Sequence, residues 1–257
     1  MDWGNVPELL SVLEFRGLVV SFLMTAFIVW IVIRGRLSGQ WKERVRRALF
    51  LVLVATGAAA FLPSIANVQV PLQRTVSAWV LSNVASANPL VIYAPAVLVS
   101  GVVQESTKLL IAVLAFRMLT ARHNPLSANT AITLGVYVGA GYGGFEAWLV
   151  LSYVFGAVAV PAASIAVSAL ERLAAVAFHV GVAGLVWYFW YRGTVLTKIL
   201  SWLGGSLYHS LLNYGIVLLQ AGVFSITALY FFLMVGSGAA VYYLRRRLVM
   251  TDEQEIS

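Results

Sequence analysis

Long apolar segments dominate this sequence and limit what the chain can fold into. An α-helix needs about 20 apolar residues to cross the hydrocarbon core of a membrane. Seven segments of this kind can be read from the sequence: residues 16–33, 47–64, 90–116, 130–156, 162–190, 198–219 and 224–244. We therefore expect an all-α, polytopic membrane protein with about seven transmembrane helices, which lies as a multi-pass protein in the cell (cytoplasmic) membrane.

The composition excludes several classes of protein. Hydrophobic residues make up 61% of the chain and charged residues only 11%, whereas a soluble domain carries about a quarter charged residues. The same values exclude a disordered chain, which needs low hydrophobicity and high charge. The sequence contains no cysteine, so disulfides, thiolate metal sites and a cysteine nucleophile are all excluded.

Basic residues between the apolar segments predict the membrane orientation. If there are seven spans, thirteen of the seventeen basic residues lie in loops on one side: Arg34, Arg36, Lys42, Arg44, Arg46, Arg47, Arg117, Arg122, Arg192, Lys198, Arg245, Arg246 and Arg247. Cytoplasmic loops carry an excess of lysine and arginine. We therefore expect the N-terminus outside and the C-terminus in the cytoplasm. The basic residues set the topology, and no nucleic-acid partner is expected because they form no folded basic surface.

The pattern predicts one transmembrane domain over residues 1–257. Residues 16–64 are expected to be scaffold helices, because they contain no polar cluster, although Gly57 and Pro63 shorten the second apolar segment. Residues 90–220 form the expected core that carries the chemistry. Residues 224–244 form the last helix, and 245–257 a cytoplasmic tail.

Polar side chains occur inside the predicted core spans, where they are costly. A charge at the centre of a bilayer costs about 2.5–3.5 kcal/mol on insertion scales, so such residues usually face the protein interior and have a function. The set consists of Gln104, Glu105, Lys108, Glu146, Glu171, Arg172, His179, His209 and Asn213.

Four of these residues are predicted to lie at a similar depth. With a rise of about 1.5 Å per residue, Glu105, Glu146, His179 and His209 each lie about 16–24 Å from the cytoplasmic end of their own span. Each comes from a different helix. We therefore expect them to converge on one buried aqueous site.

Helical spacing predicts which polar neighbours share a face. Glu105 and Lys108 are three residues apart and can pair, while His209 and Asn213 are four apart. Glu171 lies closer to the outer surface, and the adjacent Arg172 is a candidate partner. Each pair could also be purely structural.

This set of groups is suited to hydrolysis. A glutamate can act as general base for water, and a histidine can hold the water or protonate a leaving amine. A second histidine and an asparagine can donate to a developing oxyanion, which is often worth about 3–4 kcal/mol. Alternatively, Glu105, Glu146, His179 and His209 could bind zinc and leave water as the nucleophile. No HExxH motif is present to favour a metal.

Four short motifs, in order, resemble the glutamate-dependent intramembrane protease superfamily. They are QESTK (Gln104–Lys108), GYGGFEA (Gly141–Ala147), ERLAAVAFHVGVAG (Glu171–Gly184) and LYHSLLN (Leu207–Asn213). This superfamily includes the type II CAAX prenyl endopeptidases, the PrsW proteases and the YhfC-type membrane proteins. Glu105 and Lys108 match the second glutamate and the lysine of the EExxK motif, and Gln104 replaces its first glutamate. Tyr142 and Glu146 match the aromatic-xxx-Glu motif, His179 the third-motif histidine, and His209 and Asn213 the HxxxN motif.

The resemblance implies an intramembrane peptidase that acts on a membrane protein or a lipidated peptide. Glu105 would be the base, His179 would position water, and Glu146 would tune or assist. His209 and Asn213 would stabilise the oxyanion. No cofactor is required in this interpretation, although zinc remains an alternative. The supporting residues would be Gln104, Lys108, Glu171, Arg172 and Tyr142.

Two other functions stay open at this point. The non-proteolytic Aph subunit of gamma-secretase resembles the same superfamily, so the chain could be a scaffold or chaperone that binds partner transmembrane helices. Gln104 favours that alternative. A transporter could use the same glutamates and histidines to relay protons. Transporters often contain inverted repeats, and the sequence shows no such internal symmetry.

Overall fold

The chain folds into helices throughout the part that the structure describes. The structure is a computed structural model that describes residues 6–34, 43–84, 88–121, 128–157 and 160–256, and no strand occurs among them. The elements are α1 (Val6–Ser11), α2 (Phe15–Ile33), α3 (Glu43–Ser64), the π-helix η1 (Ile65–Gln69), α4 (Val70–Asn83), α5 (Pro89–Thr120), α6 (Ala128–Gly156), α7 (Ala162–Arg192), α8 (Val195–Gln220) and α9 (Ile226–Ile256). The all-α prediction is confirmed.

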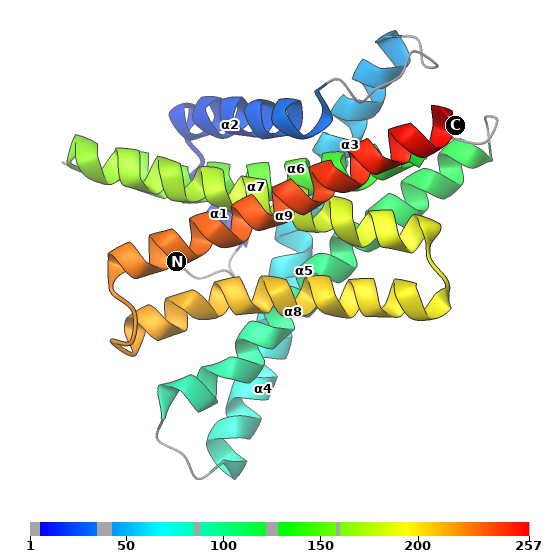
Figure 1. Ribbon diagram of the computed structural model, residues 1–257. Coiled ribbons are helices and arrows are strands. Elements are labelled where there is room, and N and C mark those ends of the chain that lie inside the picture. Colours follow the sequence, from blue (N-terminus) through cyan, green and yellow to red (C-terminus); the bar gives the residue numbers. More distant parts are fainter. Residues whose placement is uncertain (1–5, 35–42, 85–87, 122–127, 158–159, 257) are drawn as a thin grey trace.

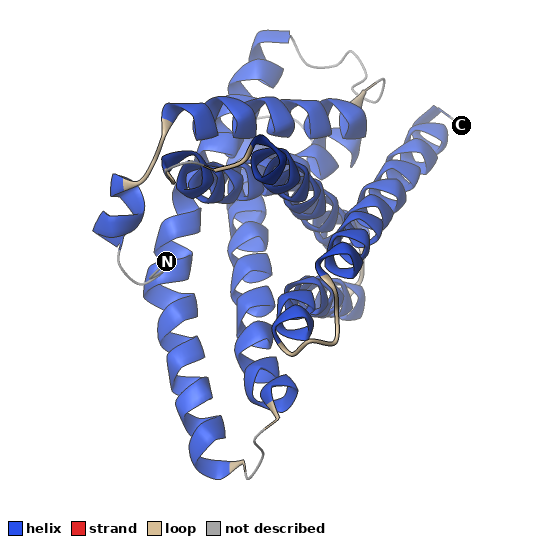
Figure 2. Ribbon diagram, turned by 90° about the vertical axis from the view of Figure 1, so that its left-hand side faces the viewer, coloured by secondary structure: helices blue, strands red, loops and turns tan. Residues whose placement is uncertain are grey.

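Two sets of helices cross each other. In Figure 1, α2, α7 and α8 run in similar directions, while α3, α4 and α5 run across them. Figure 2 shows that the end of the molecule formed by α4 and α5 extends away from the remaining helices. Helix α6 lies in the middle and packs against α2, α3, α5 and α7, and α7 also packs against α8 and α9.

Small residues allow α6 to take this central position. A side-chain carbon at Gly139 would clash with the backbone carbonyl oxygen of His179, and one at Gly141 would clash with that of Val54. Glycine at such positions lets helix backbones approach closely, as is common in membrane bundles. Residues 131–143 are buried without exception.

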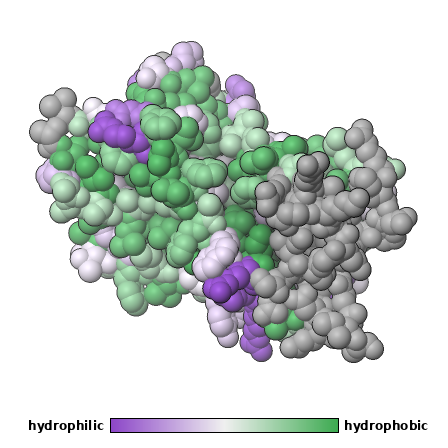
Figure 3. Space-filling view, turned by 90° about the horizontal axis from the view of Figure 1, so that it is seen from above, coloured by the Kyte–Doolittle hydropathy of each residue, from purple (hydrophilic) through white to green (hydrophobic). Residues whose placement is uncertain are grey.

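Five helices are long and apolar enough to cross a membrane, in the part of the chain that the structure describes. They are Phe15–Ile33, Phe50–Asn83, Pro89–Thr120, Ala162–Arg192 and Ile226–Met250. Their outer faces expose large apolar side chains such as Leu23, Leu114 and Phe231. Figure 3 shows hydrophobic side chains over most of the coloured surface on one face. Such a surface is expected of a protein whose helices contact lipid.

Helices α6 and α8 are not among these five, although the sequence predicted a span in each. Both helices contain several glycine and polar residues. For α6 the physical reason is its central position, because a helix surrounded by protein needs no apolar surface for lipid.

The second predicted span is longer than expected. The second apolar segment was predicted to cover residues 47–64, but the helix continues through η1 and α4 to Asn83. Proline removes one backbone hydrogen bond, and here the interruption is absorbed by a π-helical turn. Residues 65–83 are therefore helical and do not form the loop that the sequence predicted.

The predicted tail is also helical. Helix α9 runs from Ile226 to Ile256, so residues 245–256 continue the helix that was predicted to end at 244. Arginine is a good helix former, and charged residues mark the edge of the membrane without ending a helix.

Candidate functional site

Glu105 is the centre of a buried cluster of ionisable side chains. Helix α5 places Glu105 and Lys108 on one face, and Lys108 Nζ donates a hydrogen bond to Glu105 Oε1 at 2.5 Å. His209 Nδ1, on α8, donates to the same oxygen at 2.6 Å. All three side chains are at most 3% exposed. The other carboxylate oxygen, Glu105 Oε2, is buried and has no hydrogen-bond partner among the described residues.

His179 connects this cluster to α6. Its Nδ1 lies 3.0 Å from Lys108 Nζ, and its Nε2 lies 2.9 Å from Glu146 Oε2. An ammonium group can only donate, so Nδ1 accepts and Nε2 carries the proton that is donated to Glu146. Both ring nitrogens of His179 are therefore engaged.

Arg172 extends the cluster away from Glu105. Its Nη1 donates to Glu146 Oε1 at 3.0 Å, and its Nε donates to Glu171 Oε2 at 2.6 Å. Nη2 also contacts Glu171 Oε1. Seven ionisable side chains from four helices thus form one continuous chain of hydrogen bonds. The chain contains three carboxylates and two basic groups, so it carries a net charge of −1 when both histidines are neutral. Removing one partner from such a buried pair is costly.

A second polar chain runs beside the first. Gln104 Nε2 donates to Gln69 Oε1 at 3.1 Å and to Ser100 Oγ at 3.2 Å. Asn213 Nδ2 donates to the same Ser100 hydroxyl oxygen at 3.1 Å. Gln104 Oε1 is buried without a partner among the described residues. This amide chain joins η1, α5 and α8.

Tyr142 closes one side of the cluster. It is fully buried, and its hydroxyl lies 2.8 Å from Ser64 Oγ at the end of α3. Its ring centroid lies 5.6 Å from that of His179, and Lys108 Nζ lies 5.6 Å from it as well. A lysine ammonium at this distance over an aromatic face is stabilised by a cation–π interaction.

A small cavity of about 80 Å³ opens onto the two chains. It is lined by Glu146, Glu171, Arg172, Ala175, Phe178, His179, His209, Leu212, Asn213, Ile216, Leu233 and Ser237. A polar cavity of this size has room for a few water molecules. It lies between α6, α7, α8 and α9 and is the place where water could reach the cluster.

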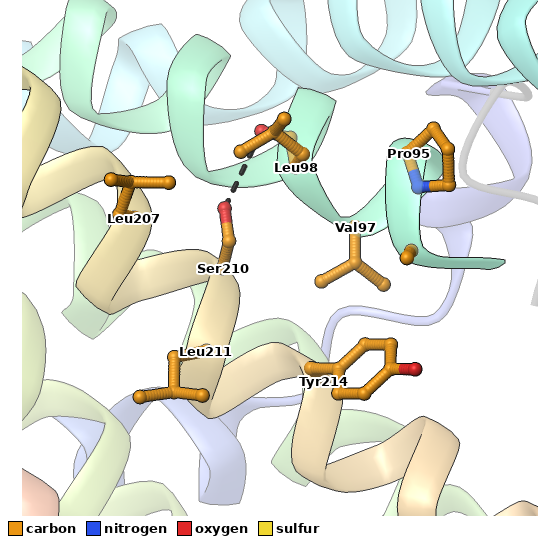
Figure 4. A pocket seen from close by; sticks show the side chains of 8 residues that line it. Pro95, Val97, Leu98, Leu207, Ser210, Leu211 and Tyr214 are labelled. Carbon is orange, nitrogen blue, oxygen red and sulfur yellow. Dashed lines mark hydrogen bonds between the residues drawn. The ribbon is translucent and has the colours of Figure 1, made fainter. Parts of the chain in front are cut away.

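A larger groove of about 440 Å³ lies between α5 and α8 and has a different character. It is lined by Pro95, Leu98, Leu211 and Tyr214, among others, and contains no acidic, basic or histidine side chain (Figure 4). Its Ser210 hydroxyl is engaged with the Leu98 carbonyl oxygen. The Tyr214 hydroxyl donates to the Leu90 carbonyl oxygen, and the groove contains no carboxylate or imidazole to act as a general base, so we place the candidate site at the polar cavity.

Three of the residues could hold a metal ion. Ligand atoms of Glu105, His179 and His209 lie within 4.8 Å of one another, and two imidazoles with a carboxylate are a donor set that suits zinc. Glu146, which the sequence suggested as a fourth ligand, is not part of this group; its oxygens contact His179 Nε2 and Arg172. The Lys108 ammonium contacts both Glu105 Oε1 and His179 Nδ1, so a dication would have to displace a like charge.

The structure brings together all ten side chains that the sequence selected. Seven form the ionisable chain: Glu105, Lys108, Glu146, Glu171, Arg172, His179 and His209. Gln104 and Asn213 belong to the amide chain, and Tyr142 packs on the histidine. Sequence reasoning missed Ser64, Gln69 and Ser100. An uncharged polar residue in an apolar segment is a weak signal, and Gln69 lay in a predicted loop.

Comparison with protein-family models, with curated proteins and with solved structures gives no match for this chain.

Proposed function

We propose that the protein is an intramembrane peptidase that hydrolyses a peptide bond of a membrane-associated substrate with an activated water molecule. One observation carries the proposal: the Glu105 carboxylate is buried and fixed at Oε1 by Lys108 and His209, while Oε2 has no hydrogen-bond partner in the part of the chain that the structure describes. A buried carboxylate oxygen without a hydrogen bond costs free energy. A water molecule that donates to Oε2 would satisfy it.

In this mechanism Glu105 is the general base. Its Oε2 takes a proton from water as the water oxygen forms a bond to the carbonyl carbon of the substrate. The same carboxyl then gives that proton to the leaving amine as the carbon–nitrogen bond breaks. Lys108 and His209 hold the carboxylate in one orientation throughout, which is the arrangement that acid–base catalysis needs.

Asn213 is the candidate for oxyanion stabilisation. Its amide nitrogen carries two hydrogens; one is used in the bond to Ser100, and the other has no partner among the described residues. The second can donate to an oxyanion in the cavity that Asn213 and His209 both line. A donor fixed in advance is worth more than one that must reorient.

His179 has a positioning role in this proposal. Its two nitrogens bind Lys108 and Glu146, so it could contact the water directly only after releasing one of them. Arg172 and Glu171 in turn hold Glu146. Glu146 would therefore act on the site indirectly, by accepting the hydrogen bond from His179 Nε2 and so fixing the orientation of that ring.

The proposal includes the topology expected from the sequence. The chain would cross the cell membrane seven times, with the N-terminus outside and the C-terminus in the cytoplasm. Five helices are apolar enough to contact lipid along their length, and α6 and α8 would cross in contact with them. The polar cavity then lies within the membrane, where the substrate is a transmembrane or lipidated segment.

No metal is required for this chemistry. Zinc could be held by Glu105, His179 and His209 and would then activate the water itself. The position of the Lys108 ammonium between two of these ligands favours the metal-free arrangement.

Two alternatives have an observation in their favour. Gln104 stands where related proteases carry a glutamate, which favours a scaffold that binds partner helices. The continuous chain from Glu171 to Glu105 favours a transporter that relays protons. Cleavage of a peptide by the purified protein would distinguish the peptidase from both.

The test uses the purified full chain in liposomes with a panel of single-span transmembrane peptides, each carrying a fluorophore and a quencher on opposite sides of the span. We expect discrete products by mass spectrometry. Glu105→Gln should reduce the rate by at least about a hundredfold, because a general base contributes about 10²–10⁴-fold. His179→Ala should abolish cleavage in a folded protein. His123→Ala is the matched control, because position 123 lies between the predicted spans 90–116 and 130–156. Cleavage by Glu105→Gln at the wild-type rate would disprove the assignment.

A further inference from the structure

The π-helix η1 lies next to the candidate site, in a segment with no expected function. Hydrogen bonds of the i→i+5 type replace the usual pattern there, as in the bond from Val70 N to Ile65 O. Such turns are rare inside α-helices and occur frequently at functional sites.

Ser64 and Gln69 lie at the two ends of the π-helical turn, Ser64 as the residue that precedes it and Gln69 as its last residue. In a regular α-helix, residues five apart point about 140° away from each other, because each residue turns by about 100°. In the wider turn of a π-helix, whose hydrogen bonds join residues five apart, this angle is smaller. Both side chains are buried, and both reach residues of the site: Ser64 contacts Tyr142, and Gln69 accepts a hydrogen bond from Gln104.

Gln69 is the first member of a bridge that ends at the cavity. From Gln69 Oε1 the bonds run to Gln104 Nε2, then to Ser100 Oγ, and then to Asn213 Nδ2. Gln73 anchors the other side of Gln69, since Gln69 Nε2 donates to Gln73 Oε1 and Gln73 Nε2 donates to the Ala96 carbonyl oxygen. Asn213 lines the polar cavity. The first of these bonds joins η1 to α5, and the other two are made between side chains of α5 and α8.

We propose that Gln69 is a positioning residue that fixes the orientation of the Asn213 carboxamide through Gln104 and Ser100. Through these bonds η1, which lies outside the predicted core of residues 90–220, contributes to the candidate site. The catalytic consequence rests on the proposed peptidase function, but the orientation of Asn213 can be measured without any substrate.

The first measurement is nuclear magnetic resonance of the full chain labelled with ¹⁵N-asparagine. The side-chain NH₂ signal of Asn213 is assigned as the one that Asn213→Asp removes. Gln69→Met keeps the length of the side chain and removes its accepting oxygen, so we expect the Asn213 signal to shift. Asn67→Met is the matched control, because Asn67 is an exposed amide on the same π-helix. An unchanged Asn213 signal in Gln69→Met would overturn the proposal.

The second measurement separates positioning from a merely structural role. Gln69→Met leaves the buried Gln104 amide without one of its two acceptors, since only Ser100 Oγ then accepts from it, and should lower the melting temperature. The double variant Gln69→Met, Gln104→Met removes both polar partners, so the melting temperature should recover. The Asn213 signal should stay displaced in the double variant. If signal and stability recover together, Gln69 has a structural role only.

The activity assay provides the last readout. With any peptide that the wild type cleaves, Gln69→Met should lower kcat about tenfold and leave KM within about twofold, because misplaced catalytic groups lower the rate of the chemical step. The double variant should remain equally slow. If kcat recovered in the double variant together with the melting temperature, the positioning role would be refuted. If the wild type cleaves no peptide, the proposed function fails, and the Asn213 signal alone decides this inference.

Discussion

Lys108 is the residue whose loss should destabilise the fold most directly. Its ammonium is 1% exposed and binds Glu105 Oε1, His179 Nδ1 and the face of Tyr142. Lys108→Met keeps the apolar stem and removes the charge, so the Glu105 carboxylate stays buried with one partner. Breaking a buried ion pair costs about 3–5 kcal/mol. For a chain of this size that corresponds to a fall in melting temperature of about 6–20 °C.

The assay is thermal unfolding of the purified protein, followed by the fluorescence of its eight tryptophans. Lys198→Met is the matched control on α8 and should change the melting temperature by only a few degrees. The double variant Lys108→Met, Glu105→Leu removes the stranded carboxylate and should recover most of the loss. The reasoning would be refuted if Lys108→Met had the same melting temperature as Lys198→Met, or if the double variant melted at a lower temperature than Lys108→Met.

Three further predictions concern packing, metal binding and topology. Gly139→Ala should lower the free energy of unfolding by about 1–3 kcal/mol, because the new carbon meets the backbone of α7. Gly204→Ala has open space around it and should leave the stability unchanged or raise it. A Gly139→Ala protein with a higher melting temperature than Gly204→Ala would contradict this. Lys108→Met should raise zinc affinity by at least about a hundredfold, since a unit charge about 4 Å away is worth about 4 kcal/mol at an effective dielectric constant of 20; equal zinc content by elemental analysis would argue against the lysine as barrier. Because the chain has no cysteine, a single cysteine placed among residues 35–42 should react with an impermeant maleimide only in opened cells, while one at 158–159 should react in intact cells; the reverse pattern would invert the topology.

Much of the site could be predicted because charged and amide side chains are conspicuous in apolar helices. Glu105, His179 and His209 come from three helices, and a common depth was enough to predict that they meet. Depth depends only on the rise per residue. The pair Glu105–Lys108 depends only on local spacing and was predicted for the same reason.

The partners across helices could not be predicted in this way. Lys108 binds His179, and Arg172 binds Glu146 as well as its neighbour Glu171. These contacts depend on how each helix is rotated about its axis and on the angle at which α5 crosses α7. The rotation of such a helix about its axis is hard to predict from its sequence, because the sides that face lipid and the sides that face protein are both hydrophobic.

The sequence by itself determined that the chain is helical and apolar enough for a membrane, and it determined which side chains are too costly to face lipid. These properties follow from the local free energy of placing each residue in hydrocarbon. Only the tertiary structure decided that the helix continues past Pro63, that Ser64 and Gln69 contact residues of the site, and that α6 is enclosed by its neighbours. Those features depend on backbone hydrogen bonds and close contacts between segments far apart in the chain, and the free energy of such contacts is not contained in any one segment.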